Sequence, residues 1–157
     1  MNENKEMDAY MQLMLSFAHV QKNMVRFIQK SAVEKGLSIP QYSILMTIIS
    51  CKEMTQKNIG EKTFLPKSTL SQAVDGLVKE GYLDRRQVED NRRETLLALS
   101  PKGQALVEEL HLQEDGLHQV FKAASEQFTD EQVEELLQAH RKISSYLKEV
   151  ELEVATK

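Results

Sequence analysis

One short segment constrains the fold of this sequence more than any other, the stretch YLDRRQVEDNRRETLLALSP at residues 82–101. Two β-leaning runs, 82–88 and 95–100, flank a polar loop that we expect to span Glu89–Glu94. The rest of the chain favours helices, because its apolar residues recur at helical spacing. The sequence therefore predicts a mainly α fold with a small β-hairpin, and two adjacent arginines, Arg92 and Arg93, lie at the hairpin's tip.

Helix-start signals divide the segment before the hairpin. A long amphipathic helix is expected from about Met7 to Ser31, and Gly36 follows as its stop. Ser38 precedes Gln41 by the spacing of a capping box, so a second helix begins there. That helix is apolar nearly all round and is expected to be buried. A short polar helix starting at Thr55 and a longer one ending before Gly81 complete this part.

Two further helices are expected after the hairpin. The first begins at Ser100-Pro101, and its apolar face runs without interruption to Ala124. The second begins with a capping box formed by Thr129 and Gln132. The apolar stripes of the terminal helices are longer than a small core can cover. Pairing with a second copy of the chain would bury them, so we expect a homodimer.

Composition and charge limit the functional class. The 157 residues, 41% apolar and 28% charged, fit one globular domain. The net charge of −4 is concentrated in the carboxyl-terminal third, and the middle of the chain is mildly basic, which permits a local phosphate-binding face. We find no secretory signal and no transmembrane run. A single cysteine, Cys51, fits a reducing compartment, so we expect a cytoplasmic protein.

The two helices between Thr55 and Lys79 match a helix-turn-helix, whose second helix enters the DNA major groove. The outward face of that second helix begins with residues able to contact phosphates or base edges: Lys67, Ser68, Thr69, Ser71 and Gln72. The hairpin that follows is then a wing. Arg92 and Arg93 at its tip suit the negative potential of a narrow minor groove.

Four stretches, LSIPQYSIL, STLSQAVDGLVKEGYLDRR, EDNRRETLLALSPKGQAL and FTDEQVEELL, resemble the MarR family of winged helix-turn-helix transcription regulators. The resemblance spans nearly the whole chain. It implies a single MarR-type domain over 1–157, with a DNA-binding core at 38–100 and dimerisation helices at 1–35 and 104–157. It further implies a homodimer that binds pseudo-palindromic operator DNA, usually as a repressor relieved by a small ligand or an oxidant.

The resemblance also assigns roles to single residues. Asp75 stands where the family often has an aspartate that braces the wing arginine through a salt bridge. Arg93 falls on the wing-tip arginine, yet Asn91 replaces the aspartate that commonly precedes it by two residues, so either Arg92 or Arg93 could reach DNA. A pocket for a small apolar or aromatic ligand is implied between the dimer helices and the DNA-binding core, with four candidate lining residues: Phe17, Met24, Tyr42 and Met46.

Other reactive residues favour structural roles. We expect Cys51 to be a buried, inert thiol, with redox sensing as the alternative. His111, Glu114 and His118 share a helix face, which we expect to be a solvent or interface face and not a metal site. No catalytic set or Gly-rich phosphate loop indicates an enzyme, and we expect no cofactor. The alternative function is a winged-helix protein-interaction module that does not bind DNA.

Overall fold

Helices dominate this computed structural model, which describes residues 7–157 except the side chain of Arg92. The elements run in the order α1 (Ala9–Glu34), α2 (Ile39–Ile48), β1 (Glu53–Thr55), α3 (Gln56–Thr63), α4 (Lys67–Lys79), β2 (Leu83–Val88), β3 (Asn91–Leu99), α5 (Pro101–Leu112), α6 (Leu117–Ser125) and α7 (Asp130–Ala155). The prediction of a mainly α fold with a small β-wing is confirmed. None of the described helices is long and apolar enough to cross a membrane.

Two compact units divide the chain, Met1–Gln119 and Val120–Lys157. The hydrophobic core lies in the first unit, between Ala32 and Leu110. In the second unit, α7 has no buried residue, although its apolar residues recur at helical spacing. The first unit therefore carries the packing that holds the fold, and the second presents an uncovered apolar face.

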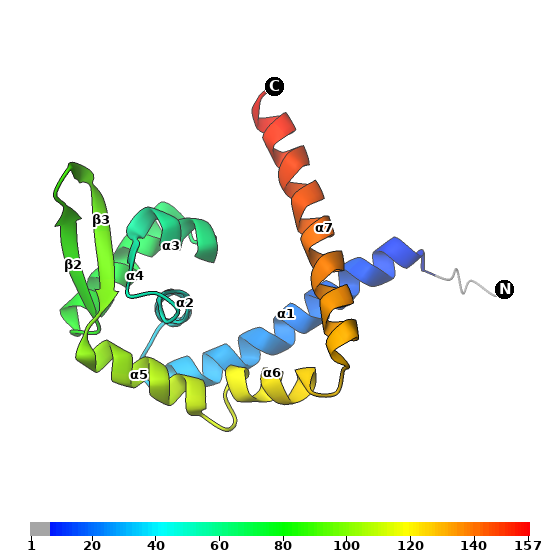
Figure 1. Cartoon of the computed structure of the whole chain (residues 1–157), viewed down its shortest axis with the longest axis horizontal. Helices are drawn as coiled ribbons and strands as arrows, with labels where there is room; N and C mark the ends of the chain where they lie inside the picture. The colour runs from blue at the N-terminus through cyan, green and yellow to red at the C-terminus, as the bar shows by residue number, and fades with distance from the viewer. Residues whose placement is uncertain (1–6) are drawn as a thin grey trace. The chain divides into compact units, whose positions relative to one another are not determined.

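The core forms where α2 and α4 pack with the sheet and α5 (Figure 1). Its fully buried side chains come from all four parts: Ile44, Leu45, Ile48, Val74, Leu77, Leu83, Leu97, Val107 and Leu110. Each such side chain contributes roughly 1.5–3 kcal/mol when it leaves water. A Cβ at Gly76 of α4 would lie 2.5 Å from Nε2 of Gln41 in α2, so a side chain there would displace the Gln41 amide. The prediction that α2 is buried is confirmed.

Four predicted helix starts are confirmed, because the side chains of four residues accept hydrogen bonds from the first turns of α2, α3, α5 and α7: Ser38, Thr55, Ser100 and Thr129. At α2 the box is complete. Ser38 Oγ accepts from the Gln41 N–H at 3.2 Å, and Gln41 Oε1 accepts from the Ser38 N–H at 3.0 Å. These bonds satisfy backbone donors that a helix leaves without partners.

The three strands form an antiparallel sheet in the order β1–β3–β2. The expected loop Glu89–Glu94 was wrong, because β3 begins at Asn91 and the turn is only Glu89–Asp90. Charged residues can pair as strands when both faces of the hairpin meet solvent. The polarity of residues 91–94 therefore does not indicate a loop. Strand β1 was not predicted, since three residues carry too little pattern to be recognised.

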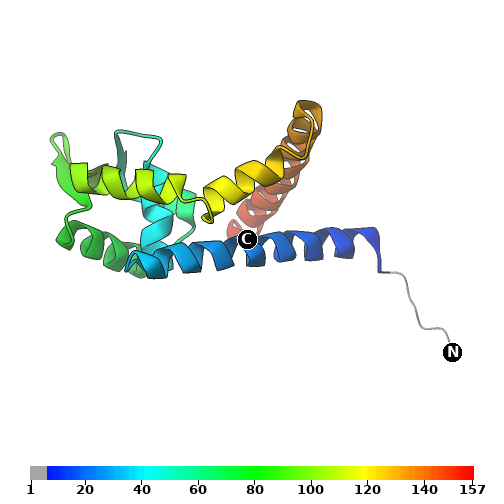
Figure 2. The ribbon, with the colours of Figure 1, turned by 90° about the horizontal axis from the view of Figure 1, so that it is seen from below.

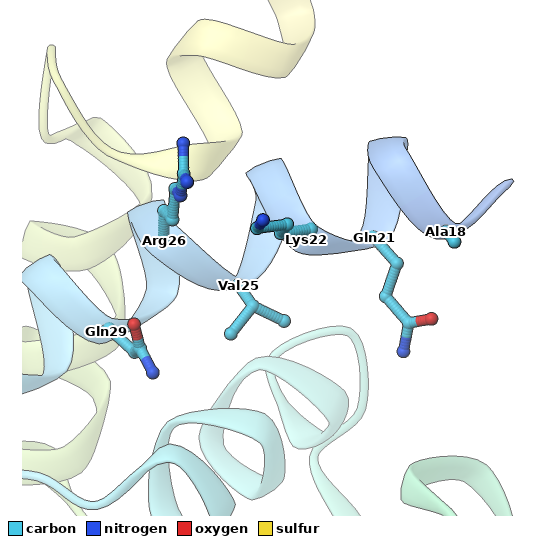
Figure 3. A pocket seen from close by; sticks show the side chains of 6 residues that line it. All are labelled: Ala18, Gln21, Lys22, Val25, Arg26 and Gln29. Atoms are coloured by element: carbon cyan, nitrogen blue, oxygen red, sulfur yellow. The ribbon is translucent and has the colours of Figure 1, made fainter. Parts of the chain in front are cut away.

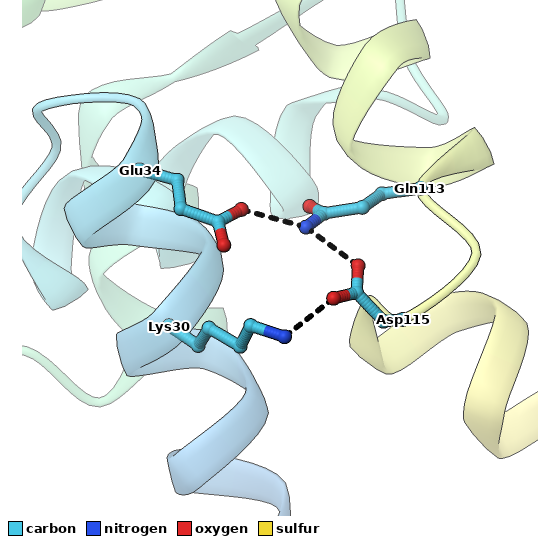
Figure 4. A network of polar contacts seen from close by, with 4 residues as sticks. All are labelled: Lys30, Glu34, Gln113 and Asp115. Carbon is cyan, nitrogen blue, oxygen red and sulfur yellow. Dashed lines mark hydrogen bonds and ion pairs between the residues drawn. The ribbon is translucent and has the colours of Figure 1, made fainter.

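The single helix predicted after Ser100 was also wrong, because it is interrupted between Leu112 and Leu117. Figure 4 shows the polar contacts made at this interruption. Gln113 Nε2 donates to Glu34 Oε2 of α1 at 2.8 Å and to Asp115 Oδ1 at 3.0 Å, while Lys30 of α1 pairs with Asp115. The hydrogen bond with Lys30 lowers the pKa of the Asp115 carboxyl and raises that of the Lys30 amine. These bonds fasten the interruption to α1.

The predicted first helix, 7–31, is confirmed in type and runs somewhat later, from Ala9 to Glu34. Its carboxyl-terminal end lies beside α5, where Lys35 pairs with Glu109 (Figure 2). Its amino-terminal half extends beyond the core and exposes large apolar side chains: Tyr10, Met11, Leu13, Met14, Leu15, Phe17 and Val20. Like α7, this half presents an apolar face without a covering element in the first unit.

Candidate nucleic-acid interface

Helices α3 and α4 pack closely across a short turn, residues 64–66. Ile59 of α3 and Leu70 of α4 are buried. A Cβ at Gly60 would lie 2.9 Å from Leu70 Cδ2, so the glycine lets α3 approach α4. Pro66, the N-cap residue of α4, has no capping side-chain hydrogen bond. The arrangement is a helix-turn-helix whose second helix begins without a side-chain cap.

The amino-terminal half of α4 presents a polar face opposite its buried one. Lys67, Ser68 and Gln72 are exposed, while Thr69 and Ser71 are half-buried. The opposite face packs into the core through Leu70, Ala73, Val74 and Leu77. The structure thus brings the five predicted α4 residues to the outward half of one helix. Their hydroxyl, amide and ammonium groups are of the kinds that bind phosphates and base edges.

The wing, which we define as strands β2 and β3 with their turn, carries the predicted arginines near its tip. Arg93 is exposed, and its N–H donates to Asn91 Oδ1 at 3.1 Å. Side chains alternate along a strand, so Arg93 lies on the same face of β3 as Leu97. The Leu97 face is the one that packs on the core. The backbone of Arg92 lies in β3, but its side chain is outside the described part.

Asp75 of α4 pairs with Arg85 of β2, with Oδ1 2.5 Å from Nη2. The family resemblance implied that Asp75 pairs with an arginine at the wing tip. The observed partner, Arg85, lies nearer the base of the wing. Arg85 reaches Asp75 because it lies opposite Leu97 on the core-facing side of the sheet. Both side chains are substantially exposed, so the pair contributes little stability by itself. It does link α4 to the wing.

Arg85 and a second arginine, Arg86, were missed as site residues. Arg86 Nη2 lies 2.6 Å from Glu53 Oε2 of β1, which ties the outer strands of the sheet together. The position of Arg85 could have been predicted from the sequence, because side chains alternate along a strand and Arg85 therefore shares the core-facing side with Leu83. The role of Arg86 could not be found, since Glu53 belongs to the strand that sequence patterns did not reveal.

The expectation for Cys51 was wrong, because the thiol is exposed. Helix α2 ends at Ile48, so Cys51 falls in the following turn and not on the buried helix face. The His111 and His118 rings lie 4.9 Å apart across the α5–α6 interruption. Burial, and then the charge of His111, lower the pKa of His118. Among the described residues, no group of three metal-ligating side chains is gathered there or elsewhere.

A shallow hollow of about 430 Å³ lies along α1, and all six residues that line it belong to that helix: Ala18, Gln21, Lys22, Val25, Arg26 and Gln29 (Figure 3). None of the predicted pocket residues lines this hollow. Tyr42 is only 3% exposed in the core, and its burial raises the pKa of its phenol. Met46 packs against the same core, Met24 is half-buried, and Phe17 is exposed on α1.

Comparisons with known proteins agree with this geometry. Residues 35–94 match the MarR family. The HTH-type transcriptional repressor YetL of Bacillus subtilis (strain 168) is 24% identical over 124 residues, which cover 78% of this chain and 72% of YetL. AbsC, a MarR family transcriptional regulator from Streptomyces coelicolor, has a TM-score of 0.75 at 19% identity, covering 90% of this chain and 96% of its own. A mutant MarR from E. coli complexed with operator DNA has a TM-score of 0.66 at 20% identity. The match covers 87% of this chain and 99% of the MarR chain.

Proposed function

We propose that this protein, a winged helix-turn-helix regulator of the MarR family, represses transcription as a homodimer that binds pseudo-palindromic operator DNA and is released by a small ligand. The observation that carries the proposal is the pairing of two surfaces. The polar half of α4 and the arginine-bearing wing are linked to each other by the ion pair between Asp75 and Arg85. A helix and a wing held in this way can engage adjacent grooves of one duplex.

In the proposed complex, α4 lies in the major groove. Lys67, Ser68 and Thr69 lie in its first turn, where free N–H groups and the helix dipole favour phosphate. Gln72 is one turn further along and is exposed, so its amide can pair with an adenine edge. The wing then inserts Arg93, Arg92 or both into the neighbouring minor groove.

The homodimer is proposed to form through the segments 1–35 and 104–157. Their described parts expose large apolar side chains on α1 and α7, including Leu13, Met14, Leu136 and Leu147. A soluble monomer rarely leaves such stripes uncovered, and a second copy offers the same stripes in return. Two copies would present two α4 helices, which matches the two half-sites of a palindromic operator.

The proposed release by a small apolar or aromatic ligand would involve α1 and the core. Phe17 and Met24 on α1 keep exposed surface that such a ligand could cover. Tyr42 and Met46 pack in or against the core, so a ligand that touched them would have to displace core side chains. Binding of that kind would couple the ligand to the position of α2 and, through it, to α4.

The proposal is tested by operator binding of the double variant Arg92→Ala with Arg93→Ala. A gel-shift or fluorescence titration against DNA upstream of the protein's own gene should show affinity reduced by about tenfold or more, with the salt dependence shallower by roughly two counterions. The matched control removes two positive charges from α7, as Lys142→Ala with Lys148→Ala, and should bind as the wild type does.

Two results would contradict the proposal. Unchanged affinity in the arginine double variant removes the wing from the interface. A wild-type protein that binds no DNA above the non-specific level, at low salt and across the upstream region, instead favours a protein-interaction module.

A further inference from the structure

Phe64, the residue that ends α3 in the helix-turn-helix, is unusual in both its backbone and its surroundings. Its φ of 56° and ψ of 22° lie in the left-handed region, and no other non-glycine residue among those described has a positive φ. Its side chain is 91% exposed. Glycine or asparagine ordinarily occupies such a helix end, because a Cβ is strained there.

Neither packing nor backbone geometry accounts for a phenylalanine at this place. The N–H of Phe64 donates to the Gly60 carbonyl at 3.0 Å, a bond that any residue except proline could make. The next residue, Leu65, packs against the core and supplies the turn's hydrophobic anchor. A phenylalanine at this place therefore adds backbone strain and exposed apolar surface, and no contact described within the chain compensates for them.

The residues next to Phe64 in the sequence are basic or lead into α4. Exposed Lys62 and Lys67 flank it on either side in the sequence. It is the first residue of the turn into α4, whose amino terminus has no side-chain cap. A basic, N–H-rich border around an apolar group is complementary to an anionic surface that has an apolar spot. In the major groove, the apolar spot is the 5-methyl group of thymine.

We propose that Phe64 contacts a thymine methyl group in the major groove at each half-site of the operator, and so contributes to sequence specificity. The inference rests on the proposed function, because it requires α4 to enter the groove. The contact would give a role to a residue that combines a left-handed backbone with a side chain that is 91% exposed. The ring carries no charge, so the contact adds affinity without adding to the salt dependence.

The test combines a protein change with a DNA change. Phe64→Gly removes the ring and relieves the backbone strain, and Phe64→Asn is a second variant that tolerates the same backbone. Both should melt at or above the wild-type temperature. Both should bind the operator about three- to tenfold more weakly with an unchanged salt slope. Lys67→Ala is the contrasting control, because loss of a phosphate contact should reduce that slope by about one.

Operators in which deoxyuridine replaces thymine at single positions lack only the methyl group. At one position per half-site, this replacement should weaken wild-type binding about as much as Phe64→Gly does. It should have no further effect on Phe64→Gly. The inference is overturned if Phe64→Gly binds as tightly as the wild type, or if every deoxyuridine substitution weakens both proteins equally. Failure of the proposed function is distinct, because the wild type would then not bind the operator at all.

Discussion

Helices α4 and α7 have similar sequence patterns but differ in burial. Both place leucines and valines at helical spacing, yet α4 buries Leu70, Val74 and Leu77, whereas α7 buries nothing. The difference lies in what surrounds them, since α4 is covered by α2 and strand β2 within one unit. An amphipathic pattern thus predicts that one face of a helix will be buried. It does not indicate whether the same chain or a second molecule buries that face.

The largest effect is expected from a core leucine of α4. Leu77→Ala removes a fully buried side chain and should lower the free energy of unfolding by about 2–5 kcal/mol, whatever the protein concentration. Urea denaturation followed by circular dichroism measures the loss. Leu152→Ala in α7 deletes the same atoms from an exposed site and should cost less than about 0.5 kcal/mol. Equal losses in the two variants would remove the contrast between the helices.

An intermediate effect is expected when the apolar stripe of α7 is charged. Leu136→Lys with Leu147→Lys should weaken self-association by about a hundredfold or more, because lysine ammonium groups would have to be desolvated in the interface. Sedimentation equilibrium measures the shift from dimer to monomer. The helical circular dichroism signal should remain, since neither leucine is buried in the described chain.

The matched control for the α7 variant is Gln138→Lys with Glu149→Lys, which adds lysines on the opposite side of the same helix and should stay dimeric. A wild-type protein that is monomeric at micromolar concentration would refute the dimer proposal. It would leave the contrast in burial unchanged.

The smallest effect is expected at His118, near the boundary between the two units. Its pKa in the folded protein lies below the ordinary value of 6.5. As the pH falls below that value, the unfolded chain takes up the proton first, so stability is lost through this histidine on acidification. The melting temperature should fall by about 1–2 °C between pH 7 and pH 5.5 because of this group. His118→Gln should flatten that slope, and an unchanged slope would contradict the assignment.

Local chemistry was predictable from the sequence, and contacts between distant segments were not. Ser38, Thr55, Ser100 and Thr129 mark helix starts because an N-cap needs only the residues that follow it. The break at Gln113 was not predicted, because the contacts made there, Gln113 with Glu34 and Asp115 with Lys30, join segments far apart in the sequence. In addition, the four non-helical residues 113–116 make up about one helical turn, so the spacing of apolar residues along the sequence does not reveal the break.

The candidate interface divides in the same way. The outward residues of α4 follow from helix periodicity, and the place of the arginines near the wing tip follows from strand pairing. The partner of Asp75 required the sheet's register, which aligns Arg85 with Leu97. The exposure of Phe64 was hidden because an isolated phenylalanine ordinarily indicates a buried position.

Ser100 fixes the wing at its base and not at its tip. Its hydroxyl donates to the Gly81 carbonyl after α4 and accepts from the Gly103 N–H at the start of α5, and its own N–H donates to the Tyr82 carbonyl. A single residue thereby joins the end of α4, the base of the wing and the start of α5, and none of these contacts involves residues 89–94. Substitutions at the wing tip are therefore expected to leave this anchor intact, so the proposed DNA contact and the folding of the wing depend on different residues.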